Sequence, residues 1–294
     1  MKFAKICYGR QNTSYSVLWD NLPEFLRELY YLKVYRPVYK EAELFSAEGI
    51  ILRLPFYLNE KNSGLLEKYI QKEFCRLKEE GVEFFSVQEH MPIPKGFKVL
   101  TGRSLICMLS NYLVSRSCIK RQKSFEEADI AVIDGGNSLT DILLNVISPK
   151  ATKIWLYTLR YDYIKPLLED IFAQTGLCIG VCSSFNSYLL KNADIVINLN
   201  KNGEYFGSLS KNAVYIDIAD DRNNTNRLMR LRKDVAVMRD FKIDYNNTSL
   251  KPNCAEAALC VINKYFREMI FNGVTPARLK NAAECVNSFN LRPF

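Results

Sequence analysis

The sequence contains one histidine, His90, among its 294 residues. This scarcity excludes clusters of histidines that bind a metal together, and a Ser-His-Asp triad would have to use His90 itself. The sequence also lacks an apolar run of the roughly 20 residues that a bilayer span requires. Its first residues lack the apolar stretch of a secretory signal, so we expect a cytoplasmic protein that is not bound to a membrane.

The nine cysteines lack the spacing of a disulfide framework, which agrees with a reducing compartment. The net charge of +8 comes from 40 basic and 32 acidic residues. Two basic clusters contribute to it: Arg116, Lys120, Arg121 and Lys123, and Arg227, Arg230, Arg232 and Lys233. Neither cluster is interleaved with the aromatic residues and glycines of an RNA-binding surface. We therefore expect solvated faces or the rim of an anion site, and no nucleic-acid partner.

Strands alternate with helices along most of the chain, which predicts an α/β protein with parallel sheets. Lys2–Tyr8 is expected to be an edge strand of the first domain. The changes in pattern predict a small N-terminal α/β domain, a connecting helix, a doubly wound parallel sheet with helices on both faces, and a C-terminal helical tail that returns to the interdomain region. The corresponding ranges are 1–98, 99–125, 126–245 and 246–294.

The most informative stretch is a glycine turn between a strand and a helix. The apolar run 130–133 breaks at Asp134-Gly135-Gly136-Asn137-Ser138 and resumes with helical periodicity. Glycines allow a sharp turn, and the N-terminus of the following helix offers unpaired N–H groups to a phosphate. The sequence therefore predicts a binding site for an anionic or nucleotide-like ligand at this turn. The predicted binding residues are Gly135, Gly136, Asn137 and Ser138.

From about residue 100 to 270, the order of elements resembles the NAD(P)-binding Rossmann domain of the shikimate dehydrogenase and glutamyl-tRNA reductase group. The resemblance rests on the glycine turn and on three later segments, which are 157–160, 193–198 and 213–217. It implies a smaller substrate-binding domain followed by a Rossmann-type nucleotide domain. The implied function is that of an NAD(P)-dependent oxidoreductase, a dehydrogenase or reductase acting on a small polar substrate.

Thr158 and Arg160 follow the second strand of this domain, where members that use NADP place an arginine and a small hydroxyl residue. The resemblance thus implies NADP, with Asn198 lining the site at the end of a later strand. The glycine fingerprint is degenerate, because Asn137 and Thr140 occupy its second and third glycine positions. The alternatives are a tight turn without a ligand and, for Arg160, an ordinary surface arginine.

Lys95 and His90 are the candidate catalytic residues, and both lie in the loop that precedes the connecting helix. Lys95 is nearest in placement to the lysine that the resembled dehydrogenases use for proton transfer. His90 would titrate near neutral pH and could also move a proton. The alternative function is a catalytically silent protein that binds a small-molecule or nucleotide ligand. The sequence is compatible with a homo-oligomer.

Overall fold

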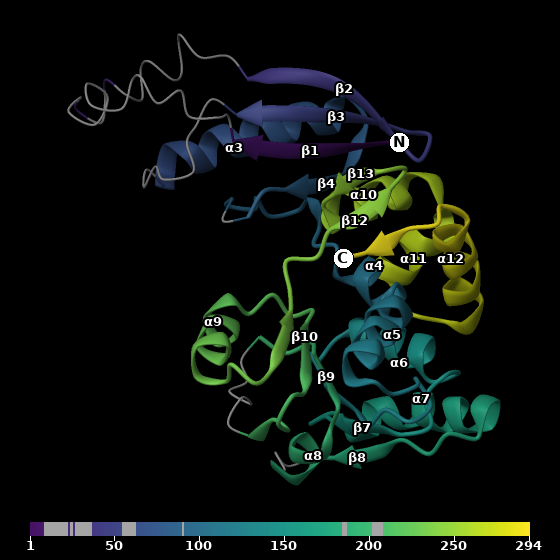
Figure 1. Ribbon diagram of the computed structural model, residues 1–294. Coiled ribbons are helices and arrows are strands. Elements are labelled where there is room, and N and C mark those ends of the chain that lie inside the picture. The colour runs from purple at the N-terminus through teal and green to yellow at the C-terminus, as the bar shows by residue number, and fades with distance from the viewer. Residues whose placement is uncertain are drawn as a thin grey trace. The chain divides into compact units, whose positions relative to one another are not determined.

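The computed structural model describes residues 1–8, 23, 26, 37–54, 63–89, 91–183, 187–201 and 208–294. The chain forms two compact units (Figure 1). Unit 1 consists of Met1–Gly102 and Asn253–Arg267, and unit 2 consists of Arg103–Pro252 and Glu268–Phe294. The N-terminus thus belongs to unit 1 and the C-terminus to unit 2. Residues 246–294, predicted as one tail, are divided between the two units.

Unit 1 contains a five-stranded sheet with the order β2-β3-β1-β4-β5. The strand β1 pairs in parallel with β3 and β4, β4 pairs in parallel with β5, and β2 and β3 form an antiparallel hairpin. The prediction that Lys2–Tyr8 is an edge strand is wrong, because strands from later in the chain pair with both of its edges. The elements are β1 (Lys2–Tyr8), β2 (Val38–Leu44), β3 (Ala47–Leu54), α3 (Ser63–Glu79), β4 (Val82–Val87), β5 (Lys98–Leu100) and α10 (Pro252–Ile262).

The helix α3 covers this sheet with an apolar stripe. Ile70, Phe74 and Leu77 recur at helical spacing and are at most 1% exposed. The ring of Phe74 stacks on that of Phe85 with 4.5 Å between the centroids. The chain leaves the helix at Gly81, whose φ of +87° is the left-handed conformation that glycine adopts most readily. The apolar spacing and the glycine that follows it predict a helix that ends here, and the structure has both.

Unit 2 contains a six-stranded sheet with the order β11-β10-β9-β6-β7-β8, and all of its neighbouring pairs are parallel. Counted from β6, this is the order 3-2-1-4-5-6 of doubly wound dinucleotide-binding domains. The predicted fold class, an α/β protein with a Rossmann-type parallel sheet, is confirmed. The strands are β6 (Ile130–Ile133), β7 (Ile154–Tyr157), β8 (Gly180–Cys182), β9 (Ile195–Asn198), β10 (Val214–Asp217) and β11 (Ala236–Met238).

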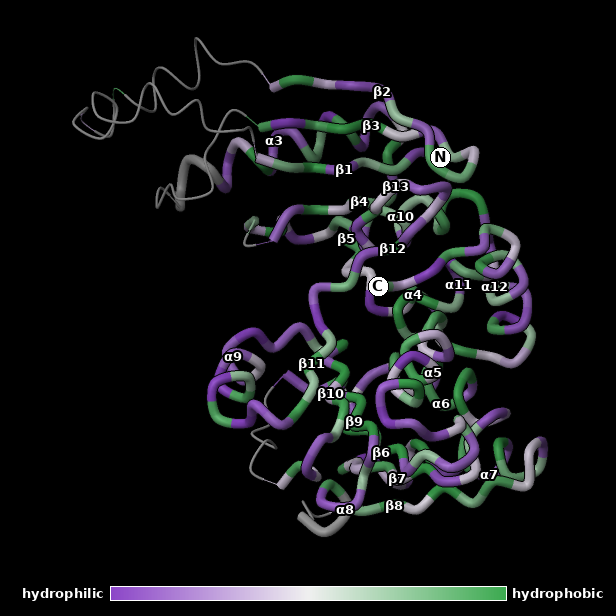
Figure 2. Tube along the Cα trace, in the orientation of Figure 1, coloured by the Kyte–Doolittle hydropathy of each residue, from purple (hydrophilic) through white to green (hydrophobic). Residues whose placement is uncertain are grey.

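Both faces of this sheet are covered. Every residue of β6, β9 and β10 is buried, as expected of a parallel sheet between two layers of helices. Leu190 and Leu228 pack in one cluster with Ile133 and Val196 on one of the faces. Figure 2 shows hydrophobic residues along the central strands. The crossover helices are α6 (Ser138–Ile147), α7 (Tyr161–Thr175), α8 (Ser187–Asn192) and α9 (Arg222–Leu231).

The segment predicted as one connecting helix consists of two helices in unit 2, α4 (Arg103–Met108) and α5 (Ser110–Arg121). Leu109 separates the two helices, because its φ of −92° and ψ of 8° are not helical. After the parallel sheet, a small antiparallel sheet forms with the order β13-β12-β14. The remaining elements are β12 (Ile243–Tyr245), β13 (Thr248–Leu250), α11 (Lys264–Asn272), α12 (Pro276–Ser288) and β14 (Arg292–Pro293).

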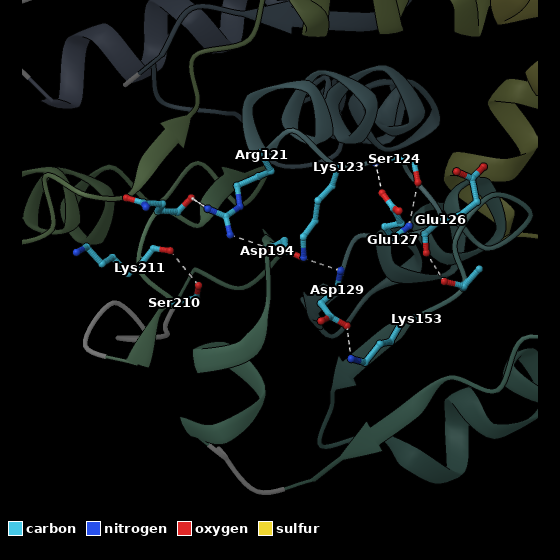
Figure 3. A network of polar contacts seen from close by, with 12 residues as sticks. Arg121, Lys123, Ser124, Glu126, Glu127, Asp129, Lys153, Asp194, Ser210 and Lys211 are labelled. Carbon is cyan, nitrogen blue, oxygen red and sulfur yellow. Dashed lines mark hydrogen bonds and ion pairs between the residues drawn. The ribbon is translucent and has the colours of Figure 1, made fainter.

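Asp194 forms ion pairs with two basic side chains at the N-terminal edge of the unit 2 sheet (Figure 3). Its Oδ1 lies 2.9 Å from Nη2 of Arg121, and its Oδ2 lies 2.6 Å from Nζ of Lys123. The backbone N–H of Asp129 donates to Oδ2 at 3.0 Å, and the Asp129 carboxylate pairs with Lys153. Part of the basic cluster at the end of α5 therefore neutralises a buried carboxylate.

Two kinds of feature are missing from the described part of the chain. None of its helices combines the length and the hydrophobicity that crossing a membrane demands. It also contains no cluster of three or more His, Cys, Asp or Glu side chains that could hold a metal ion.

Candidate functional site

The glycine turn connects β6 to α6, and its two glycines have different functions. A Cβ atom at Gly135 would lie 2.4 Å from the carbonyl oxygen of Leu199, so this glycine lets the turn pass against the backbone that follows β9. Gly136 has a φ of +74° and open space where a Cβ would be. Asn137 caps α6, because its Oδ1 accepts a hydrogen bond from the N–H of Leu139 at 3.0 Å. The predicted turn between the strand and the helix is confirmed, and the structure adds the cap at Asn137.

Gly135→Ala is expected to lower the free energy of unfolding of unit 2 by up to about 3 kcal/mol, because the obstacle is a backbone atom that cannot rotate away. Gly136→Asn is the matched control, since asparagine tolerates a positive φ and meets no atom there. Thermal unfolding midpoints should fall clearly for Gly135→Ala and little for Gly136→Asn. Equal shifts would contradict the close approach at Gly135.

The carboxylate of Asp134, directly after β6, is the centre of the turn. Its Oδ1 accepts hydrogen bonds from the N–H of Gly136 at 3.0 Å, the hydroxyl of Thr140 at 2.5 Å and Nη2 of Arg160 at 2.9 Å. Its Oδ2 accepts from the hydroxyl of Thr158 at 2.7 Å and from Nε of Arg160 at 3.0 Å. These five donors leave little acceptor capacity, so Asp134 is a cross-link between the turn and the loop after β7.

Arg160 presents the two-nitrogen edge of its guanidinium to Asp134 in a bidentate pair. Its Nη2 also lies 3.4 Å from the carbonyl oxygen of Asn137, and its Cζ lies 4.8 Å from the ring centroid of Tyr163. The resemblance implies that Arg160 marks a site for NADP. In the structure, its charge is paired within the protein.

A second carboxylate, Asp141, lies in the first turn of α6. Its Oδ1 is buried and has no hydrogen-bond partner among the described residues. Burial raises the pKa of Asp141, with Arg160 opposing this effect and Asp134 adding to it. Burial also favours a higher pKa for Asp134, but the hydrogen bonds that it accepts, first of all from Arg160, outweigh burial and lower its pKa.

Asn198 belongs to a separate network at the ends of β9 and β10. Its Nδ2 donates to Oδ1 of Asp217 at 3.2 Å, and its Oδ1 accepts from the N–H of Asn200 at 3.1 Å. The other oxygen of Asp217 accepts from the hydroxyl of Thr225 at 2.6 Å and from the N–H of Asp221 at 3.1 Å. Burial raises the pKa of Asp217, which pairs with neutral groups in this network.

The predicted binding residues of the turn and of the β7–α7 loop come together around Asp134, whereas Asn198 holds Asp217. The predicted catalytic residues belong to unit 1. Lys95 is exposed in the loop between β4 and β5, and His90 lies outside the described residues. Arg103, at the start of α4 in unit 2, donates to the carbonyl oxygen of Ala219.

Three aspartates of these networks are not among the site residues predicted from the sequence: Asp134, Asp141 and Asp217. The signal in the sequence is an aspartate at the end of a buried strand, followed within about two helical turns by a threonine. This pattern occurs twice, as Asp134 with Thr140 and as Asp217 with Thr225. Such a pair indicates that the carboxylate accepts a hydrogen bond from the helix that follows the strand.

No protein-family model and no curated protein matches the chain. Among solved structures, a quinate dehydrogenase from Corynebacterium glutamicum in complex with NAD is 10% identical and has a TM-score of 0.38, with 98% of this chain and 99% of that chain covered. A shikimate dehydrogenase in complex with NADP+ is 9% identical with a TM-score of 0.36, covering 98% and 95%. A putative aspartate carbamoyltransferase from Trypanosoma cruzi is 9% identical with a TM-score of 0.37, covering 80% and 76%.

The first two of these structures belong to the dehydrogenase group that the order of elements resembles. The third is described as a putative carbamoyltransferase, which is a different class of enzyme. With TM-scores below 0.5, these similarities carry no functional argument, and the function proposed below depends on the geometry of the chain itself.

Proposed function

We propose that unit 2 binds a nicotinamide dinucleotide at the C-terminal edge of its sheet, and that the protein is an NAD(P)-dependent oxidoreductase acting on a small polar substrate. The observation that carries the proposal is the strand order. From β6 the chain winds outward through β7 and β8, then returns to β9 and winds the other way. In such sheets ligands bind outside the carboxyl ends of the strands at this reversal, and the glycine turn follows β6 at that point.

The surface beside the turn supports this proposal. Gly136 and Asn137 are exposed at the N-terminus of α6, whose dipole favours an anion. Leu159, Tyr161 and Tyr163 follow β7 with exposed fractions of 77%, 45% and 64%. Exposed apolar side chains next to a turn of this kind are suited to a planar base.

Lys95 and His90 remain the proposed proton-transfer residues. Lys95 is accessible to solvent and lies just before β5. A lysine or histidine can accept the proton that a hydroxyl group releases when hydride leaves the adjacent carbon. This role is part of the proposal. The test compares the turnover rate of the Lys95→Ala protein with that of the Lys95→Arg protein.

NAD(H) is expected to stabilise unit 2, because a ligand that binds only the folded state at 100 times its dissociation constant adds about 2.7 kcal/mol. The measurement is the thermal unfolding midpoint with increasing NAD+, NADH, NADP+ and NADPH. Adenosine alone is the control for base stacking without the pyrophosphate. Failure of every dinucleotide to shift the midpoint or to give heat in a calorimetric titration would refute the proposal.

The second candidate function is a ligand-binding protein without catalysis. The hydrogen bonds within the turn favour this candidate. The N–H of Gly136 already donates to Asp134, and the N–H of Leu139 already donates to Asn137. A pyrophosphate would compete with these acceptors for the same donors. Weak dinucleotide binding, together with no turnover of any small hydroxy or oxo acid, would favour this candidate.

A further inference from the structure

Three ionisable side chains belong to the turn, the first turn of α6 and the loop after β7, and together they do not form a cationic site. Arg160 contributes one positive charge, and Asp134 and Asp141 each contribute a negative charge when ionised. Asp134 binds Arg160 through two hydrogen bonds of 2.9 and 3.0 Å and is 6% exposed. The arginine that follows the second strand is therefore already neutralised.

Asp141 adds a charge that no hydrogen bond offsets. Its Oδ1 is buried without a hydrogen-bond partner in the described part of the chain. Asp141 follows Thr140, whose hydroxyl donates to Oδ1 of Asp134 at 2.5 Å, so the two carboxylates belong to the same short segment. The formal sum for the three groups is +1 − 2 = −1 when all are ionised. The three side chains together therefore offer no net positive charge to a phosphate at the loop after β7.

In doubly wound dinucleotide domains, the residues after the second strand contact the 2′ position of the adenosine ribose. A free arginine there would favour a 2′-phosphate, which carries about two negative charges near neutral pH. A ribose hydroxyl has no charge and is not repelled. The charge balance at Arg160 therefore discriminates between the two classes of dinucleotide.

We propose that Asp134 and Asp141 make this site selective for NAD(H) over NADP(H), by cancelling the charge that Arg160 would otherwise present to a 2′-phosphate. The inference rests on the proposed function, since it assumes that a dinucleotide binds at the turn. It assigns a specificity-determining function to two residues of the β6–α6 segment.

The test is the ratio of the dissociation constants of NADP+ and NAD+, measured by titration calorimetry at pH 8 and low ionic strength. The wild-type protein should bind NAD+ at least about tenfold more tightly. Asp141→Asn should narrow the ratio by about tenfold, because it removes one elementary charge from a partly buried site. This variant breaks no hydrogen bond of the carboxylate, so it is expected to fold.

Asp170→Asn is the matched control, because it removes the same charge from an exposed position in the C-terminal half of α7, away from the turn. Its ratio should equal that of the wild-type protein. Asp134→Asn is a second variant that releases Arg160, and it should narrow the ratio further. It loses part of the hydrogen-bond network, so its unfolding midpoint is measured alongside.

The inference and the proposed function fail in different ways. Wild-type protein that binds NADP+ as tightly as NAD+, or a ratio that Asp141→Asn leaves unchanged, would overturn the selectivity and leave the dinucleotide site standing. Wild-type protein that binds neither dinucleotide would overturn both.

Discussion

Asp194→Ala is expected to lower the free energy of unfolding of unit 2 by about 3 kcal/mol, at the low end of the cost of breaking a buried ion pair. The Asp194 side chain is 5% exposed and binds Arg121 and Lys123. Its removal leaves both cations without their carboxylate and the N–H of Asp129 without its acceptor. The two cations are 21% and 37% exposed and can reach water, which limits the loss.

The same interaction predicts how stability depends on pH. Burial by itself favours a higher pKa for Asp194, but hydrogen bonds from Lys123, the N–H of Asp129 and Arg121 outweigh it and lower the pKa. A carboxylate whose pKa is lower in the folded state stabilises above its unfolded pKa and loses this contribution as the pH falls through the folded pKa. The difference in stability between the wild-type protein and Asp194→Asn should therefore be full at pH 7 and shrink below about pH 4.

Hydrogen exchange of peptides that cover β9 measures this effect within unit 2. Glu169→Ala on α7 is a control, because Glu169 is exposed and its ion pair with Lys165 spans 3.8 Å at the surface. Such pairs contribute about 0–1 kcal/mol. A difference between the wild-type protein and Asp194→Asn that stayed constant from pH 7 to pH 3 would contradict the role of the ion pair.

Phe74→Ala is expected to lower the free energy of unfolding of unit 1 by about 3–5 kcal/mol, because it leaves a cavity where an aromatic ring was fully buried. Phe74 is 0% exposed and packs in one cluster with Ile6, Leu52 and Phe85. It also meets the ring of Phe97 edge-on, with 5.1 Å between the centroids. Truncation thus removes contacts that join α3 to the central strands and to the segment before β5.

Hydrogen exchange of peptides from β1 and α3 should rise strongly in Phe74→Ala, while peptides from β6 and β9 of unit 2 serve as an internal reference. Lys72→Ala is the matched control, since Lys72 is exposed on the same helix and its replacement should change stability by less than about 0.5 kcal/mol. Phe74→Leu should fall between the two. If α3 were protected from hydrogen exchange equally in Phe74→Ala and Lys72→Ala, the result would contradict the role of Phe74 in the core.

The sequence by itself determined the local elements of this protein. The helical spacing of Ile70, Phe74 and Leu77 predicts α3, and Gly81 and Gly176 mark the ends of α3 and α7 with φ values of +87° and +73°. Buried apolar runs alternating with helices predict the parallel sheet of unit 2. These features depend on residues a few positions apart, and so their signals are continuous in the chain.

Only the tertiary structure decided which distant residues become neighbours. Strand pairing places Lys2–Tyr8 in the centre of a sheet rather than at its edge. Arg160 lies 26 residues from Asp134 and pairs with it, and Arg121 lies 73 residues from Asp194 and pairs with it. The residue type gives the charge of a side chain. Whether that charge is free to bind a ligand depends on the residues that pair with it in the folded protein. The glycine turn could therefore be read from the sequence, and the charge at the turn could not.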